Sequence, residues 1–160
     1  MEDASNRNWL TKEEAEAFVG ANNPYYLEKW KAHSGSTLKG WNWAAALFGI
    51  QWMTYRKMYV EALLYYLFLL FAGMIIGLAF WAFRIRFNGD WIQPLFGILA
   101  GVFGNALYRK KALRTLRKFL SMDDHKRLTA LQTEGGTSIA GVIVGIVIQF
   151  AIAFLLLFLL

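Results

Sequence analysis

Residues 60–83 read VEALLYYLFLLFAGMIIGLAFWAF, and Glu61 is the only charged residue in this stretch. A helix of about 20 apolar residues crosses roughly 30 Å of hydrocarbon, so this stretch is long enough to span a bilayer with some tilt. Apolar residues make up 57% of the chain. A soluble domain of 160 residues could not bury so many, because small domains keep a large ratio of surface to volume. The sequence therefore predicts an all-α integral membrane protein.

Two further stretches are predicted to cross the bilayer. Residues 91–108 follow a short turn marked by Asn88-Gly89, and Pro94 falls in their first helical turn, where proline is tolerated. Residues 139–160 contain no charged side chain. We therefore expect three transmembrane helices, at residues 60–83, 91–108 and 139–160, in a membrane domain that covers residues 41–160.

Residues 41–55 are a second kind of membrane segment. They are apolar and aromatic, but they are too short to cross about 30 Å of hydrocarbon. The rings of Trp41, Trp43 and Trp52 suit the depth of the lipid headgroups, where amphipathic aromatic side chains are favoured. We expect an interfacial or re-entrant aromatic helix here, with a spanning helix as the alternative.

Two polar segments are expected to lie in the cytoplasm. Residues 1–40 carry a capping-box pattern at Thr11 and Glu14, which predicts a short cytoplasmic N-terminal helical segment. Residues 109–134 are predicted to be a basic helical segment. Fifteen Lys and Arg residues fall on this side, against Arg84 and Arg86 on the other. Because cytoplasmic loops carry the excess of Lys and Arg, the N-terminus is predicted to be cytoplasmic and the C-terminus periplasmic or external.

The start of the basic segment is the candidate contact for anionic lipid headgroups. Each cation near a membrane surface contributes about 1 kcal/mol of attraction to anionic lipid. The alternative is that these residues serve only as the usual cytoplasmic anchor. The formal charge of +6 has the same explanation in so hydrophobic a chain, so no nucleic-acid partner is predicted. The candidate lipid contacts are Arg109, Lys110, Lys111, Arg114, Arg117 and Lys118.

Each predicted span contains two glycines four residues apart. Such pairs leave a flat stripe on which another helix can approach closely, and this packing drives helix association in lipid. The helices could meet within one chain, in a homo-oligomer or in a larger membrane complex. The candidate helix-packing residues are Gly73, Gly77, Gly97, Gly101, Gly141 and Gly145.

Few polar side chains interrupt the membrane segments. Glu61 is expected to complement the dipole at the start of its helix and to pair with Lys57. Asn105 and Gln149 are expected to bond neighbouring helices. Asn42 and Gln51, in the short aromatic segment, are expected to reach water among the headgroups.

The sequence predicts no catalytic residue, no metal ligand and no cofactor. The chain has no Cys, and its two histidines, His33 and His125, are far apart in the sequence. Without these groups at ligand spacing, a metal site has little support. No nucleophile, base and oxyanion donor stand in a recognisable arrangement, so we do not expect an enzyme.

Five runs of sequence resemble one family of small bacterial membrane proteins, the domain-of-unknown-function family 2628. They are Phe18 to Trp30, Trp41 to Gly49 with Trp52, Tyr55 to Leu63, Gly104 to Tyr108, and Gly135 to Ser138. The resemblance implies a multi-pass protein of the bacterial inner membrane. It places Trp43, Arg56, Lys57, Tyr59 and Asn105 in a recurring pattern, and with Glu61 they are the candidate interfacial residues.

One departure from that family concerns the short aromatic helix. Members often have Gly-Pro where this chain has Gly49-Ile50. Without the proline, a sharp kink in residues 41–55 has less support.

These features favour a non-enzymatic accessory or scaffolding subunit of a membrane assembly. The alternative is a component of a small oligomeric transporter or channel, which requires a polar path through the bilayer. Glu61, Asn105 and Gln149 are the residues that could line it.

Overall fold

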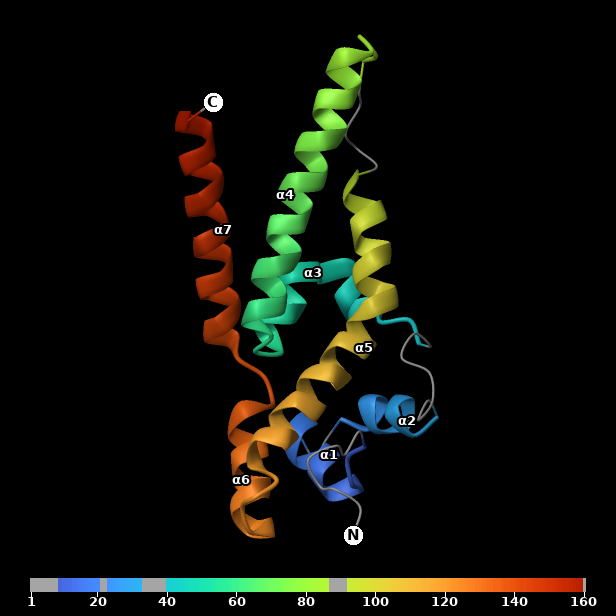
Figure 1. The fold of residues 1–160 in the computed structure, drawn as a ribbon, viewed down its shortest axis with the longest axis vertical. Helices are drawn as coiled ribbons and strands as arrows, with labels where there is room; N and C mark the ends of the chain where they lie inside the picture. Colours follow the sequence, from blue (N-terminus) through green and yellow to red (C-terminus); the bar gives the residue numbers. More distant parts are fainter. Residues whose placement is uncertain (1–8, 21–22, 33–39, 87–91, 160) are drawn as a thin grey trace.

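The computed structural model describes residues 9–20, 23–32, 40–86 and 92–159. These residues form seven α-helices and no strand, which confirms the predicted all-α class. The helices are α1 (Lys12–Val19), α2 (Pro24–Ala32), α3 (Trp43–Tyr55), α4 (Tyr59–Ala82), α5 (Ile92–Phe119), α6 (Asp124–Glu134) and α7 (Ile139–Leu159) (Figure 1).

Capping side chains set where three of these helices begin. Thr11 accepts a hydrogen bond from the Glu14 backbone and Glu14 reaches back to Thr11, so the predicted capping box at the start of α1 is confirmed. Asn42 caps α3 and Asp123 caps α6 in the same way, each with its side-chain oxygen on a free backbone N–H. A side chain that satisfies such a group stabilises a helix by about 1 kcal/mol.

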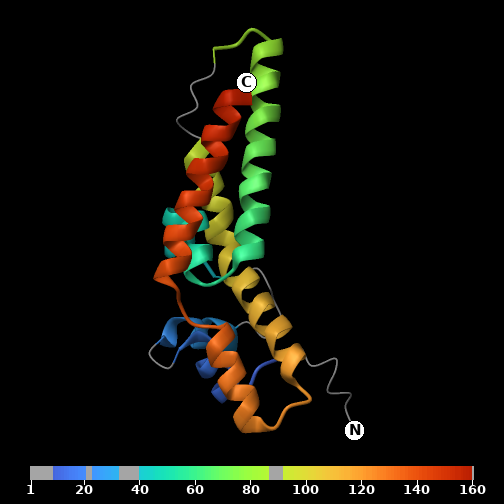
Figure 2. The same cartoon turned by 90° about the vertical axis from the view of Figure 1, so that its left-hand side faces the viewer.

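The helices fall into an elongated upper part and a compact base. In Figure 1, α4, α7 and the first half of α5 form the upper part, and α3 lies across it near the starts of α4 and α7 and the middle of α5. The second half of α5 continues into the base, where it meets α1, α2 and α6. Figure 2 shows the same division from the side, with the C-terminal end of α7 in the upper part and α1 in the base.

Two described helices are long and apolar enough to cross a membrane, at Tyr59–Ala82 and Ile139–Phe158. The prediction of three such helices is therefore correct for two of them. The expected span at residues 91–108 is not apolar enough to count as such a helix. Gln93 and Asn105 lower its mean hydropathy, and α5 continues without a break into the basic residues. The predicted basic segment at 109–134 is likewise divided between two helices, α5 and α6.

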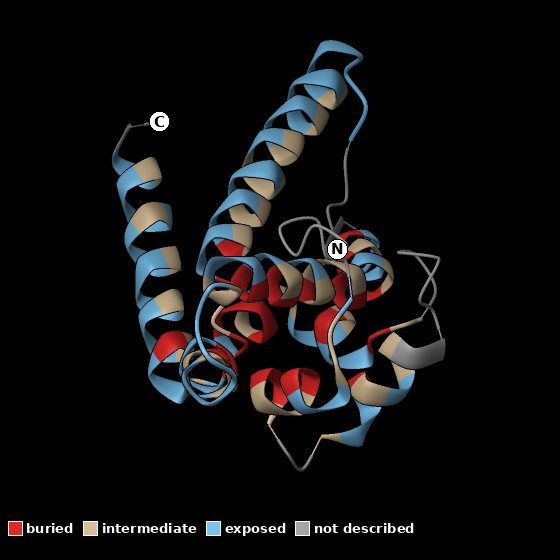
Figure 3. Cartoon of the chain, turned by 60° about the horizontal axis from the view of Figure 1, so that its bottom comes forward, coloured by how far each residue is buried: buried red, intermediate tan, exposed pale blue. Residues whose placement is uncertain are grey.

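The buried residues gather in the base and around α3, not along the two long apolar helices (Figure 3). Among the described residues, Ala62 is the only buried one in α4. In the most apolar stretch of α7, only 6% of the residues are buried. Phe18, Tyr108, Leu116 and Leu131, by contrast, are completely covered. Most side chains of the two long apolar helices thus lie on the outside of the described chain.

Gly49 divides α3 into two parts. Its backbone has φ 45° and ψ −109°, which interrupts the helix. Such angles are readily available to glycine because it has no Cβ. The kink whose support was reduced by the missing proline is therefore present, since glycine alone supplies the bend.

The first half of α5 packs closely on α3 through its glycines. A Cβ added at Gly97 would lie 2.6 Å from the carbonyl oxygen of Ala46. At Gly104 it would lie 2.8 Å from the Cβ of Ala45. Because backbone cannot move aside as a flexible side chain can, the α3–α5 distance depends on glycine at position 97.

We expect Gly97→Ala to destabilise the protein by about 1–3 kcal/mol, since its methyl group would overpack a helix crossing. The matched control is Gly77→Ala, because a Cβ at Gly77 meets no described atom within 4 Å. Thermal unfolding in detergent measures both variants. Equal unfolding temperatures for the two would contradict the close α3–α5 crossing.

Candidate functional site

The ammonium group of Lys111 joins three segments at the boundary between the base and the upper part. Its Nζ donates hydrogen bonds to the carbonyl oxygens of Arg56 at 3.0 Å, Lys57 at 2.9 Å and Glu134 at 3.4 Å. These oxygens lie at the C-terminal ends of α3 and α6, where the helix dipole favours a cation. Only 7% of Lys111 is exposed. Lys111 therefore ties α5 to the turns that precede α4 and α7.

Burial controls the charge of this lysine. It lowers the pKa of the Lys111 ammonium to about 8, while the carboxylates of Glu61 and Glu134 act in the opposite direction. The group is therefore mostly charged at pH 7, and it releases its proton more easily than an exposed lysine does.

Two more contacts hold the turn between α3 and α4. Lys57 has φ 56°, a left-handed conformation that is uncommon for a residue other than glycine. Its Nζ donates to the carbonyl oxygen of Thr133 at 2.9 Å. The backbone N–H of Ser138 donates to the carbonyl oxygen of Tyr55 at 2.8 Å. The start of α7 is thus fastened directly beside the end of α3.

Arg56, next to this junction, is buried among aromatic rings. Its guanidinium carbon lies 4.7 Å from the ring centre of Tyr26 and 5.3 Å from that of Tyr108. At these distances the ring face attracts a cation. The Nε and Nη1 atoms of Arg56 have no hydrogen-bond partner among the described residues. Aromatic faces from α2 and α5 therefore surround this charge.

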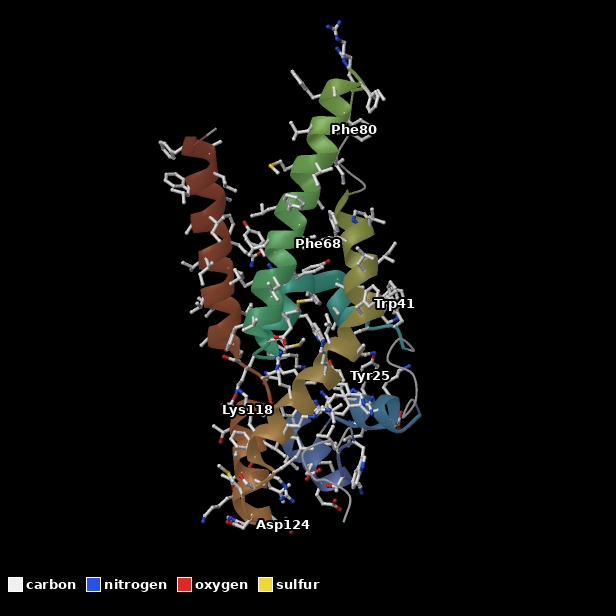
Figure 4. All side chains as sticks on the ribbon, viewed as in Figure 1. Tyr25, Trp41, Phe68, Phe80, Lys118 and Asp124 are labelled. Carbon is white, nitrogen blue, oxygen red and sulfur yellow. The ribbon has the colours of Figure 1, made fainter. Side chains whose placement is uncertain are left out.

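A network of amides holds α3 to α5 and to the residues before α3. Asn42 donates to the side-chain oxygen of Asn105 at 2.9 Å, and Asn105 donates to the carbonyl oxygen of Gly40 at 2.9 Å. The Tyr25 hydroxyl, 3.1 Å from Asn105 Nδ2, donates to the carbonyl oxygen of Trp41 (Figure 4). Asn105 does bond a neighbouring segment, as expected. Asn42 is 2% exposed, so its predicted contact with headgroup water is wrong.

Glu61 pairs with Arg114 of α5. The predicted partner, Lys57, binds Thr133 instead, because the left-handed turn directs it toward α6. Gln149 receives a hydrogen bond from Gln51 at 3.4 Å, and its backbone carbonyl accepts one from the Tyr66 hydroxyl at 3.4 Å. Glu61, Asn105 and Gln149 therefore lie in three separate networks.

The six candidate lipid-contact residues do not form one surface. Lys111 is buried, which removes it from any lipid-facing group, because its helix face turns toward the ends of α3 and α6. Arg109 is half-buried and Arg114 is paired with Glu61. Lys110, Arg114, Arg117 and Lys118 are exposed, with Lys118 on the part of α5 that belongs to the base (Figure 4).

The three glycine pairs have different surroundings. Gly97 and Gly101 lie against Ala46 of α3, and Gly141 and Gly145 lie against Thr54 at the end of α3. A Cβ at Gly73 or Gly77 would meet no described atom within 4 Å. Only the α4 pair therefore faces outward from the described chain.

Two aromatic candidates are exposed rather than packed in the core. Trp43 is 70% exposed and its ring centre lies 5.3 Å from that of Trp41. Tyr59 is 50% exposed, and its hydroxyl approaches the position of a Cβ at Gly141 to 2.8 Å. Trp43 is the first residue of α3 and Tyr59 is the first residue of α4.

The sequence interpretation missed the aromatic cluster around Arg56. It contains Tyr26, Trp30, Trp52 and Tyr108, which come from three helices. The available signal was the spacing of Tyr26 and Trp30, which stand four residues apart and so share one face of a helix.

A family model described as "Protein of unknown function (DUF2628)" matches residues 10–114. No curated protein and no solved structure matches the chain. The matched region contains Arg56, Asn105 and Lys111, and it ends within α5, before α6 and α7.

We expect the stability of the folded protein to rise between pH 8 and 10.5. The folded-state pKa of Lys111 lies below its usual 10.5, so over this range the unfolded chain binds more protons than the folded chain. The rise is on the order of 2 kcal/mol, and Lys111→Met removes it because methionine does not titrate. Thermal unfolding across this range measures it. Lys110→Met, at an exposed position, is the control. Parallel curves for wild type and Lys111→Met would contradict the assignment.

Proposed function

The chain belongs to the DUF2628 family of proteins of unknown function. We propose that it is a non-enzymatic accessory or scaffolding subunit of a bacterial inner-membrane assembly. The observation that carries this proposal is the exposure of the two long apolar helices. The buried side chains come mainly from the base, α3 and α5, whereas α4 and α7 bury almost none of theirs. Such a surface is suited to lipid and to helices of a partner.

The path of the chain supports a third crossing by the first half of α5. Lys111 contacts the residues just before α4 and α7, so all three lie at one level of the molecule. The chain leaves this level at Tyr59 and has returned to it by Lys111. If α4 crosses the bilayer, the residues before Lys111 must cross back. The glycine face of α5 against α3 shields part of this less apolar segment from lipid.

The charges along this path support a cytoplasmic base and an external C-terminus. The base carries the excess of Lys and Arg, whereas Arg84 and Arg86 follow the far end of α4. Lys110, Arg114, Arg117 and Lys118 are then the exposed cations closest to the cytoplasmic headgroups, and they attract anionic lipid.

The α3 bend favours a second candidate function, a component of an oligomeric transporter or channel. A cavity of about 530 Å³ lies at this bend, and Gln51, Tyr65 and Gln149 are among its lining residues. Interrupted helices that line a cavity are typical of transport sites within membranes. Of the three residues predicted to line a polar path, Gln149 lines this cavity, whereas Glu61 and Asn105 do not.

The assembly is tested by substituting the open glycine pair on α4. Gly73→Leu with Gly77→Leu fills outward-facing space and leaves the packing of the described chain intact. We expect a complex larger than one chain in mild detergent, and we expect the double variant to lose its partner. Ala79→Leu with Ala82→Leu adds bulk on a different exposed face and is the control. Native mass measurement gives the result.

Three outcomes separate the proposals. A larger complex with other proteins supports the accessory role, and a homo-oligomer supports the transporter alternative. A lone wild-type monomer contradicts both.

A reporter that is active only in the periplasm, fused after Leu160, tests the topology. We expect activity, because the C-terminus of α7 lies at the end opposite the base. The same reporter fused at the N-terminus should be inactive. Inactivity at Leu160 would contradict an odd number of crossings.

A further inference from the structure

A pocket of about 200 Å³ opens in the base between α1, α2 and α5. Its lining includes Lys12 from α1, Trp30 from α2 and Arg109 from α5. Leu10, Ala15 and Leu27 form an apolar part of the wall. Three helices thus bring two cations and an indole to one small space that is separate from the Lys111 junction.

Arg109 is the unusual member of this lining. It is half-buried, yet it makes no hydrogen bond or ion pair with any residue that the structure describes. The neighbouring cations differ, since Lys111 binds three carbonyl oxygens and Arg114 binds Glu61. A partly buried guanidinium without an acceptor loses solvation that nothing in the described chain replaces.

Trp30 supplies an aromatic ring to the same lining. Its Nε1 atom is buried and has no hydrogen-bond partner among the described residues. Because this burial closes the atom even to water, a ligand in the pocket meets the ring of Trp30 and not its N–H group. The ring itself is fixed by contacts with Tyr26 and Tyr108, which keep the indole in place.

The charge of the pocket determines the kind of acceptor. The lining residues include Lys12 and Arg109 but no Asp or Glu. Lys12 is exposed, and its Nζ forms an ion pair with the carboxylate of Glu16 at 3.7 Å. We therefore expect Arg109 to bind a ligand more strongly than Lys12 does. The arginine fork fits phosphate oxygens in pairs, and a cation from a second helix can contact a further oxygen of a tetrahedral anion, which a planar carboxylate lacks.

We propose that this pocket binds a phosphate group, with Arg109 as the main ligand, Lys12 as a second cation and the Trp30 ring as part of the wall. Its volume suits a phosphate with a few attached carbon atoms. The group comes from a lipid headgroup or from free phosphate. The lipid source rests on the proposed membrane function, and the phosphate site itself does not.

The experiment compares two adjacent substitutions that remove the same charge. Arg109→Gln changes the pocket, and Lys110→Gln changes the exposed neighbour. Full-length protein in neutral detergent is titrated with inorganic phosphate, and in a second arm with phosphatidylglycerol in phosphatidylcholine nanodiscs. Tryptophan fluorescence reports binding, because Trp30 lines the pocket. Acetate at the same ionic strength is the planar comparison anion.

We expect Arg109→Gln to weaken phosphate binding by at least about tenfold, as expected when a charged hydrogen-bond partner is lost. Lys110→Gln should change it less than about twofold, as expected for an exposed charge. Binding in the inorganic arm identifies free phosphate as sufficient, and binding only in the phosphatidylglycerol arm identifies a lipid headgroup.

Arg109→Lys keeps the positive charge but loses the forked guanidinium, so we expect an intermediate loss of phosphate binding. This variant takes the place of Arg109→Gln in the test if Arg109→Gln does not fold. Equal effects of the Arg109 and Lys110 substitutions would overturn the proposal, because they would show diffuse attraction to a basic surface. Binding in neither arm, or tighter binding of acetate than of phosphate, would also overturn it. A loss of assembly in the α4 variants leaves this site unaffected, so the two proposals fail separately.

Discussion

A buried lysine that satisfies the carbonyl ends of two other helices is the constraint on which this structure depends. Lys111 binds oxygens of Arg56, Lys57 and Glu134, so the turns before α4 and α7 must come together beside α5. Its burial is favourable only because those carbonyl groups replace water. Both long apolar helices therefore start at one level and extend the same way, and the base lies on the other side of the junction (Figure 1).

The parts of this fold that local rules control could be predicted from sequence. The apolar lengths of α4 and α7 and the Thr11–Glu14 capping box depend on neighbouring residues alone. Lys110 and Lys111 show where such rules end. They are adjacent and chemically identical, yet one is exposed and the other buried, because the outcome depends on which face of α5 turns toward α3 and α6. The Gly49 bend and the aromatic cluster around Arg56 likewise require tertiary contacts.

The glycine pairs show how one sequence pattern can have different consequences. Those of α5 and α7 lie against α3 within the chain, which leaves them no room for a partner. The pair on α4 is open, and it lies on a helix that has little contact with the rest of the protein. The chain thus combines a rigid centre with a helix face that is available to another molecule. The proposed scaffolding role requires such an open face, and α4 is where a partner would bind.

The most direct test of the junction is the exchange of lysine ammonium protons, measured by 15N NMR near neutral pH on protein in detergent. Protons held by carbonyl oxygens and shielded from water exchange slowly, and the Lys111→Met variant identifies the signal by its loss. The account predicts a slowly exchanging signal from Lys111 and rapid exchange at exposed Lys110. Equally rapid exchange at both lysines would show that the Lys111 junction does not form.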